Sequence, residues 1–142
     1  CAAIETISSF FVSDGVTKFL RRKAQLYTLF SVVFYMQREK IEVDQHHKDR
    51  LESFVKLYSI FDNDMDLTGK ITDPEKTLFD WLKKYKLASS EGLNKHTNRM
   101  IRYNVMKDFL FSLTGELEAA QITLYEKMRS NSTDNVAEDP EE

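Results

Sequence analysis

Apolar residues crowd into one stretch of this chain, Leu26–Met36, which reads LYTLFSVVFYM and is interrupted only by Thr28 and Ser31. The run is too short to cross a bilayer, which takes about 20 residues. The residues before it, from Lys18 onward, include helix formers and neither Gly nor Pro. The pattern therefore predicts a helix over about Val16 to Arg38. A helix that is apolar nearly all round is a buried one, so we expect other helices to pack around it.

Five further segments show apolar side chains at steps of three and four residues, which mark one face of a helix. Asp44 is a candidate N-cap, and Asp73 followed by Pro74 is a strong helix start. The predicted helices cover about 2–11, 44–61, 73–88, 95–113 and 117–128. The sequence thus predicts an all-α fold of about six helices, packed around a buried central helix from about Val16 to Arg38.

The composition narrows the class of protein. A chain of 142 residues predicts one domain with a substantial core. Four Gly and two Pro favour long helices over a sandwich or barrel. Cys1 is the only cysteine, which excludes a disulfide framework and a Cys-rich zinc site.

With no signal peptide and no membrane-spanning run, we expect a cytoplasmic location and no membrane partner. Because the chain starts with Cys rather than Met, we expect a fragment of a longer protein.

Charge divides the chain near its end. The last thirteen residues, 130–142, contain five acidic residues and no Lys or Arg. We therefore expect a single helical domain over 1–129 and a disordered acidic tail over 130–142. The domain keeps 20 basic and 18 acidic residues, a charge of about +2. A body so close to neutral gives no global electrostatic argument for nucleic acid or for a membrane surface.

The loop Asp64–Glu75 matches the spacing of an EF-hand calcium loop. Oxygen-bearing residues stand at its first, third and fifth positions, Gly69 at the sixth and Glu75 at the twelfth. Pro74 constrains the exit helix, and no second hand is present to pair with this one. A single-site EF-hand-like calcium binder stays open as an alternative. We expect an acidic surface loop in which Asp73 caps a helix, with no metal and no cofactor.

Nothing in the sequence selects catalytic residues. No Gly-rich phosphate loop, nucleophile elbow or HExxH motif occurs. The adjacent His46 and His47 point about 100° apart on a helix, so they do not share a metal easily. The basic triplet Arg21, Arg22 and Lys23 is typical of a solvated helix end whose stems cover apolar surface. We therefore predict no catalytic site in this segment.

The stretch 85–102, YKLASSEGLNKHTNRMIR, is the most informative one. A polar, Gly-containing turn opens a helix on which Lys95, Arg99 and Arg102 share one face. The first turn of a helix presents free N–H groups that favour an anion such as a phosphate. We consider these three residues the candidate nucleic-acid contacts. The alternative is that the arginines pair with carboxylates of the same domain.

A family resemblance rests on the order of these segments. The helix opened by FLRRKAQLYTLF is followed by an amphipathic helix and then by WLKKYKLASSEGLNKHTNRMIRYNVM. This order resembles the C-terminal helical part of the ParB/sulfiredoxin-like nuclease family, whose best-known members are GmrSD-type modification-dependent restriction enzymes. The resemblance covers roughly residues 16–111. Its matching turn and helix positions are Tyr85, Ser89, Gly92, Asn94, Arg99 and Arg102.

The resemblance implies an architecture more than a reaction. In that family the nuclease-like work is associated with an N-terminal domain that carries an Asp-Gly-Gln-Gln-Arg type motif, and this chain has neither that motif nor a His-Asn-His unit. It implies a non-catalytic C-terminal helical segment of a restriction-type DNA defence protein. The parent protein is then a candidate nuclease, and the partners are its upstream domain and DNA. A helical protein-interaction module of unknown pathway remains the alternative.

Overall fold

The computed structural model describes residues 2–90, 92 and 95–137, and within them every regular element is a helix. The all-α prediction is confirmed. None of the helices has the length and apolar character that a membrane crossing requires. The helices are α1 (Ala2–Ser8), α2 (Asp14–Leu20), α3 (Lys23–Arg38), α4 (Gln45–Ile60), α5 (Asp73–Ser90), α6 (His96–Phe111) and α7 (Glu116–Ala137).

Helix starts follow the local signals. The Asp44 side chain accepts a hydrogen bond from the His47 amide at 3.1 Å, and His47 Nδ1 accepts one from the Asp44 amide at 3.2 Å. This reciprocal cap fixes the first turn of α4. Helix α5 begins at Asp73, but its cap lies one residue earlier than predicted: Thr72 Oγ1 accepts from the Glu75 amide at 3.4 Å, and Glu75 Oε1 accepts from the Thr72 amide at 2.8 Å. Helix α7 runs to Ala137, past the point where the acidic tail was expected to begin, and residues 138–142 lie outside the described residues.

The predicted single helix over Val16–Arg38 is two helices. Arg21 ends α2, and Arg22 adopts an extended backbone (φ −79°, ψ 128°) as the N-cap of α3. The turn lets Phe19 pack edge-on against Phe54 at 5.9 Å and Tyr58 at 5.8 Å. Helix α3 meanwhile packs on α1 and α6. Tertiary packing therefore breaks the helix at Arg22, although no Gly or Pro in the sequence marks the break.

Helix α3 is also not buried all round. Its inner face, with Leu29 and Val32, is fully buried, but Tyr27 is 61% exposed and Phe34 is 53% exposed. The central position belongs to α4, which packs against α2, α5, α6 and α7. The expected central role of the 16–38 segment is therefore wrong, although its inner face does join the main core.

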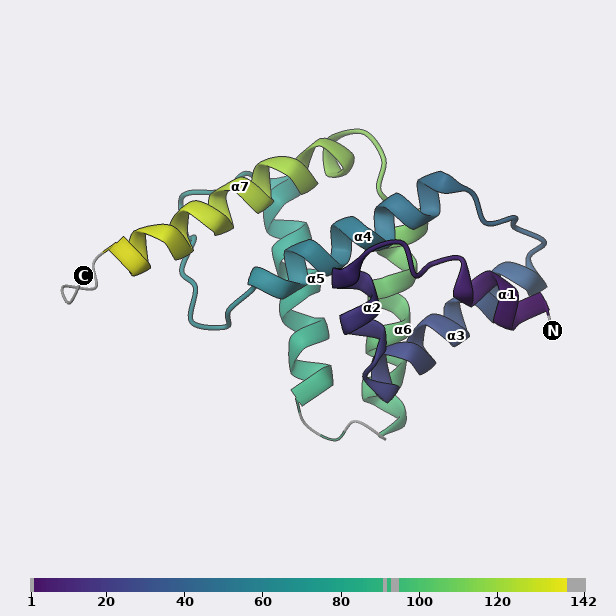
Figure 1. Ribbon diagram of the computed structural model, residues 1–142. Helices are drawn as coiled ribbons and strands as arrows, with labels where there is room; N and C mark the ends of the chain where they lie inside the picture. The colour runs from purple at the N-terminus through teal and green to yellow at the C-terminus, as the bar shows by residue number, and fades with distance from the viewer. Residues whose placement is uncertain (1, 91, 93–94, 138–142) are drawn as a thin grey trace.

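Contacts between helices define two ends of the molecule. Helices α5 and α6 are neighbours, and the end of α5 and the start of α6 lie at the lower end in Figure 1, where the α2–α3 corner also lies. Helix α3 runs in the same direction as α6, because Thr28 contacts Arg102 and Tyr35 contacts Phe111. Helix α7 packs on α4 and α5 and lies along the opposite side of the molecule (Figure 1). The lower end is where the predicted site residues fall.

Candidate nucleic-acid interface

Basic and acidic residues are segregated along the chain. Residues 15–38 and 81–107 hold twelve of the 20 Lys and Arg residues but only one of the 23 Asp and Glu residues, Glu91. Nearly all acidic residues lie in the rest of the chain, so the body charge of about +2 conceals two regions of opposite sign. The twelve are Lys18, Arg21, Arg22, Lys23, Arg38, Lys83, Lys84, Lys86, Lys95, Arg99, Arg102 and Lys107.

The fold brings these two segments together. Tyr85 on α5 donates its O–H to Gln25 Oε1 on α3, and Gln25 Nε2 donates to Ser89 Oγ at 3.4 Å. These bonds hold the start of α3 against the last turns of α5. The α2–α3 corner, the end of α5 and the start of α6 therefore share one end of the molecule (Figure 1). We call this region the basic end: Arg21, Arg22, Lys23, Lys84, Lys86, Lys95 and Arg99.

The basic end is open to solvent. Six of its seven side chains are exposed, and Lys86 is half-buried with its ammonium 5.4 Å from the centre of the Tyr58 ring. The triplet Arg21, Arg22 and Lys23, expected only as a solvated helix end, is part of this larger surface. Counting charges by predicted helix, instead of over the whole body, would have found it in the sequence.

The three predicted contact residues separate in the structure. Lys95 is the N-cap of α6 and Arg99 lies in its first turn, and both are exposed. Arg102 is only 3% exposed, and its Nη1 donates to the Ala88 carbonyl at 2.7 Å. The expectation of one exposed face for all three is wrong. Arg102 precedes the buried Phe109 by seven residues, or two helical turns, so it points to the same side as the core.

Arg102 instead joins three helices. From α6 its guanidinium reaches the Ala88 carbonyl at the end of α5, and its Nε donates to Thr28 Oγ1 on α3 at 3.4 Å. A cation at a helix C-terminus interacts favourably with the terminal carbonyls. Burial raises the pKa of Tyr85, so its hydroxyl stays protonated and acts as a donor. Arg102 is a structural residue that fixes the helices carrying the basic end.

The α5–α6 turn depends on glycine. Gly92 has φ +56°, a conformation that favours glycine, and an added Cβ would lie 2.9 Å from the Lys95 side chain. Asn98 Nδ2 donates to the Gly92 carbonyl at 3.1 Å and ties the turn to α6. Of the positions matched by the resemblance, Tyr85, Ser89 and Arg102 thus meet around α3, and Asn94 lies outside the described residues.

In the EF-hand-like loop Asp64–Glu75, the last carboxylate, Glu75, binds to another helix of the same chain. Glu75 is 2% exposed and accepts hydrogen bonds from Lys127 Nζ at 2.6 Å and from the Thr72 amide at 2.8 Å. Burial works to raise the pKa of Glu75, but hydrogen bonds from Lys127, Thr123 and Thr72 outweigh it and lower the pKa to about 2. Glu75 therefore links α5 to α7. Among the described residues, no three His, Cys, Asp or Glu side chains gather as metal ligands.

Of the two adjacent histidines, His47 takes part in the N-terminal cap of α4. His47 is half-buried, its ring lies 5.1 Å from the Phe111 ring, and its Nδ1 is engaged with the Asp44 amide. Burial lowers the pKa of His47 despite the nearby Asp44 carboxylate. Its neighbour His46 is exposed. Both histidines therefore lie in the first turn of α4, one exposed and one half-buried.

Comparison of the chain with known proteins finds no matching family model, no matching curated protein and no matching solved structure. The resemblance to the ParB/GmrSD-type proteins accordingly rests on the residues quoted for it.

Proposed function

We propose that this chain is a non-catalytic helical module that binds the phosphate backbone of DNA through its basic end. The observation that carries the proposal is the charge segregation, with six exposed basic side chains from α3, α5, α6 and their connections at one end. Lys and Arg contact phosphates and release condensed counterions, which drives binding without regard to base sequence. A net charge of −3 does not oppose this contact, because the acidic residues lie in other parts of the chain.

Buried contacts hold the basic end in shape before any ligand arrives. Arg102 and the Tyr85–Gln25 bond connect α3, α5 and α6 behind the exposed lysines and arginines. Positive charges fixed on a frame lose less freedom on binding than charges on a disordered tail. This rigidity favours a defined binding surface over a loose basic arm.

The resemblance suggests where such a module would work. A helical C-terminal part of a restriction-type defence protein would accompany an upstream nuclease-like domain of the same parent chain. A sequence-independent grip on DNA would hold the substrate near that domain and leave recognition and cleavage to it. We propose this role for the basic end within a parent of that kind.

The test is a salt titration with duplex DNA. Lys95→Gln combined with Arg99→Gln removes two exposed charges and should weaken binding severalfold at about 50 mM salt. The slope of log K against log salt should fall by about 2, since each phosphate contact contributes about 0.9. Fluorescence anisotropy of a labelled duplex measures both quantities.

The matched control is Lys70→Gln combined with Arg129→Gln, which removes two exposed basic residues outside the two basic segments. This control should bind like the unmodified chain. Equal weakening by the two double variants would show that only net charge matters. Absence of duplex binding at about 50 mM salt would contradict the proposal outright.

A protein-interaction module is the second candidate, and one observation favours it. A cavity of about 350 Å³ between α4 and α7 is lined by Leu57, Ile122 and Tyr125, and Ile122 is 67% exposed. An exposed apolar side chain beside a cavity is a common feature of protein contacts. If the duplex titration shows no binding, protein interaction through this surface becomes the better candidate function.

A further inference from the structure

The outer face of α3 carries a single stripe of exposed residues. Lys23, Tyr27, Ser31, Phe34 and Arg38 follow one another at steps of four, four, three and four, which align on one side of a helix. All five are exposed. Helix α3 contains no Asp or Glu. The stripe is therefore two aromatic rings with a hydroxyl between them and a positive charge at each end.

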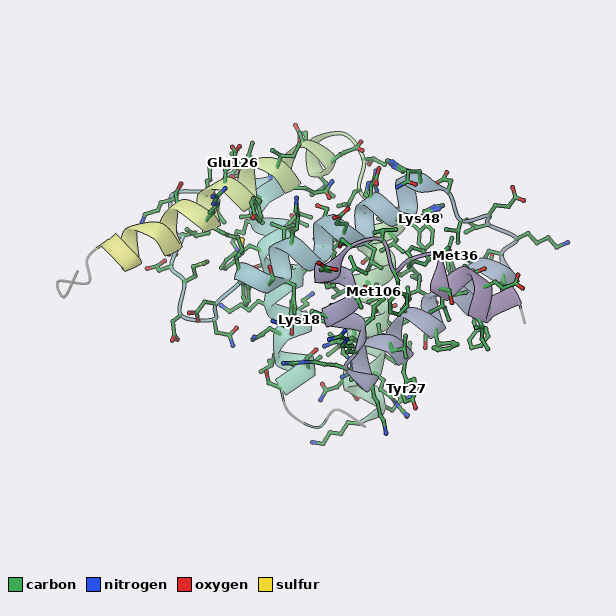
Figure 2. All side chains as sticks on the ribbon, in the orientation of Figure 1. Lys18, Tyr27, Met36, Lys48, Met106 and Glu126 are labelled. Carbon is green, nitrogen blue, oxygen red and sulfur yellow. The ribbon has the colours of Figure 1, made fainter. Side chains whose placement is uncertain are left out.

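The two rings are not needed for the packing of α3. The opposite face of the helix is already buried against α1 and α6, with Leu29, Val32 and Val33 fully covered. Tyr27 lies at the outer edge of the molecule in Figure 2, whereas Met106 of α6 lies among the packed helices. Phe30 is half-buried with its ring 6.1 Å from that of Phe34, so it supports the outer ring from beneath.

The spacing of the rings suits two bases of one strand that are not adjacent. Tyr27 and Phe34 are separated by seven residues, about 10 Å along a helix that rises 1.5 Å per residue. That length equals about three steps at the spacing of about 3.4 Å per nucleotide that a strand has in a stacked helix, and fewer steps in a more extended strand. The charges of Lys23 and Arg38 lie beyond the rings at either end. The Arg38 guanidinium lies 5.7 Å from the centre of the Tyr35 ring and forms an exposed ion pair with Glu39 at 3.8 Å. An exposed ion pair contributes little, so it exchanges readily with a phosphate.

The positive charges on and beside α3 favour a nucleic-acid strand as the ligand of the two rings. Lys23 belongs to the basic end and also starts the stripe, so a nucleic-acid backbone bound at that end continues directly onto α3. Lys107 adds a further positive charge, with its Nζ 4.9 Å from the centre of the Tyr35 ring. In a duplex the base faces are stacked on one another. An unpaired strand turns its base faces outward, and these stack on aromatic side chains at positively charged surfaces.

We infer that the outer face of α3 binds single-stranded DNA, with bases stacked on Tyr27 and Phe34 and phosphates beside Lys23 and Arg38. The electrostatic part of this contact rests on the proposed function, while the stacking part is independent of it. The basic end alone does not distinguish single strands from duplexes. The rings of α3 add a preference for unpaired bases.

The experiment compares two probes on the full chain. An oligothymidine of about 16 nucleotides provides unpaired bases, and a duplex of equal length provides none. Tyr27→Ala combined with Phe34→Ala should weaken oligothymidine binding about tenfold or more, since stacking on one ring typically contributes a factor of about 5 to 150. Duplex binding should change less than about twofold, because both substitutions leave every charge in place.

Two controls accompany the pair. Tyr27→Phe combined with Phe34→Tyr keeps both rings and should retain oligothymidine binding. Phe11→Ala combined with Ile122→Ala removes exposed apolar side chains outside α3 and should leave both probes unaffected. Circular dichroism establishes that each variant keeps the helical content of the unmodified chain.

Each outcome decides the matter. If the alanine pair binds oligothymidine as tightly as the unmodified chain, or loses both probes equally, the stacking surface is refuted and duplex binding still carries the proposed function. If the unmodified chain binds neither probe at about 50 mM salt, the proposed function fails as well.

Discussion

Helix α5 has a buried charge at each of its ends, and the two are held differently. Glu75 lies in the first turn and is paired with Lys127 of α7. Arg102 of α6 reaches the Ala88 carbonyl in the last turn of α5. A carboxylate at a helix start and a cation at a helix end both interact favourably with the helix dipole. The polarity of one helix therefore suits both interior charges.

The difference between them lies in protonation. Glu75 is a group that acid can neutralise, whereas an arginine side chain keeps its proton at every accessible pH. The contact between α5 and α7 should consequently weaken in acid, while the contact that joins α3, α5 and α6 should not. We therefore expect that, as the pH falls, the packing of α7 on α5 weakens before the packing of α3, α5 and α6 at the basic end.

The largest effect is expected from Arg102→Ala, which should lower the free energy of unfolding by about 3–4 kcal/mol. It removes a buried donor from the Ala88 carbonyl and Thr28, and it leaves a cavity between three helices. Urea unfolding followed by circular dichroism measures the loss. Arg99→Ala is the matched control on the same helix and should cost less than about 0.5 kcal/mol. A loss below about 1 kcal/mol for Arg102→Ala would remove the structural role assigned to it.

Acid should act through Glu75. Its pKa is lowered from 4.5 to about 2 in the folded protein, so its contribution to stability is fully present above pH 4.5. That contribution is lost as the pH falls from 4.5 toward 2, and it amounts to at most about 3 kcal/mol. Urea titrations across this range measure it. In Glu75→Gln the same acid range should show a smaller drop, and an unchanged drop would assign the pH dependence to other carboxylates.

The smallest effect should come from Tyr85→Phe, at about 1 kcal/mol. The substitution keeps the fully buried ring among Phe19, Phe54 and Tyr58 and removes only the hydroxyl that donates to Gln25. Thermal or urea unfolding provides the value. A cost as large as that of Arg102→Ala would mean that the hydroxyl, and not the guanidinium, holds α3 to α5.

Local signals in the sequence predicted most helix boundaries. Asp44 caps α4, and the reciprocal bonds of Thr72 and Glu75 cap α5 one residue before the predicted cap Asp73. Such chemistry lies within a few residues and is visible in a sequence to within one position. The break at Arg22 has no such signal. It exists because Phe19 and Leu29 must face different neighbours, α4 in one case and α6 in the other, and the chain turns between them.

The candidate site shows the same limit. The spacing of Lys95, Arg99 and Arg102 predicts neighbouring positions on a helix, but spacing alone does not tell which of them faces water and which faces the core. The buried Phe109, two turns after Arg102, decides it. The charge segregation needed no structure, because it follows from the order of residues once the helices are delimited. The sequence did not predict that the two basic segments lie next to each other. Their proximity depends on contacts between residues distant in the sequence, such as Gln25 and Tyr85.

The separation of charge also acts before any contact forms. Helix α7 carries Glu116, Glu118 and Glu126 and lies on the side of the molecule opposite the α2–α3 corner (Figure 1). Charges separated in this way give an electric dipole moment, on which the field of a DNA molecule acts during the approach. The encounter then begins with the productive side forward, and the association rate rises well above that of a randomly oriented collision. Salt shortens the range of this field to about 10 Å at 0.1 M. The arrangement of charges should therefore affect the association rate constant more than the dissociation rate constant.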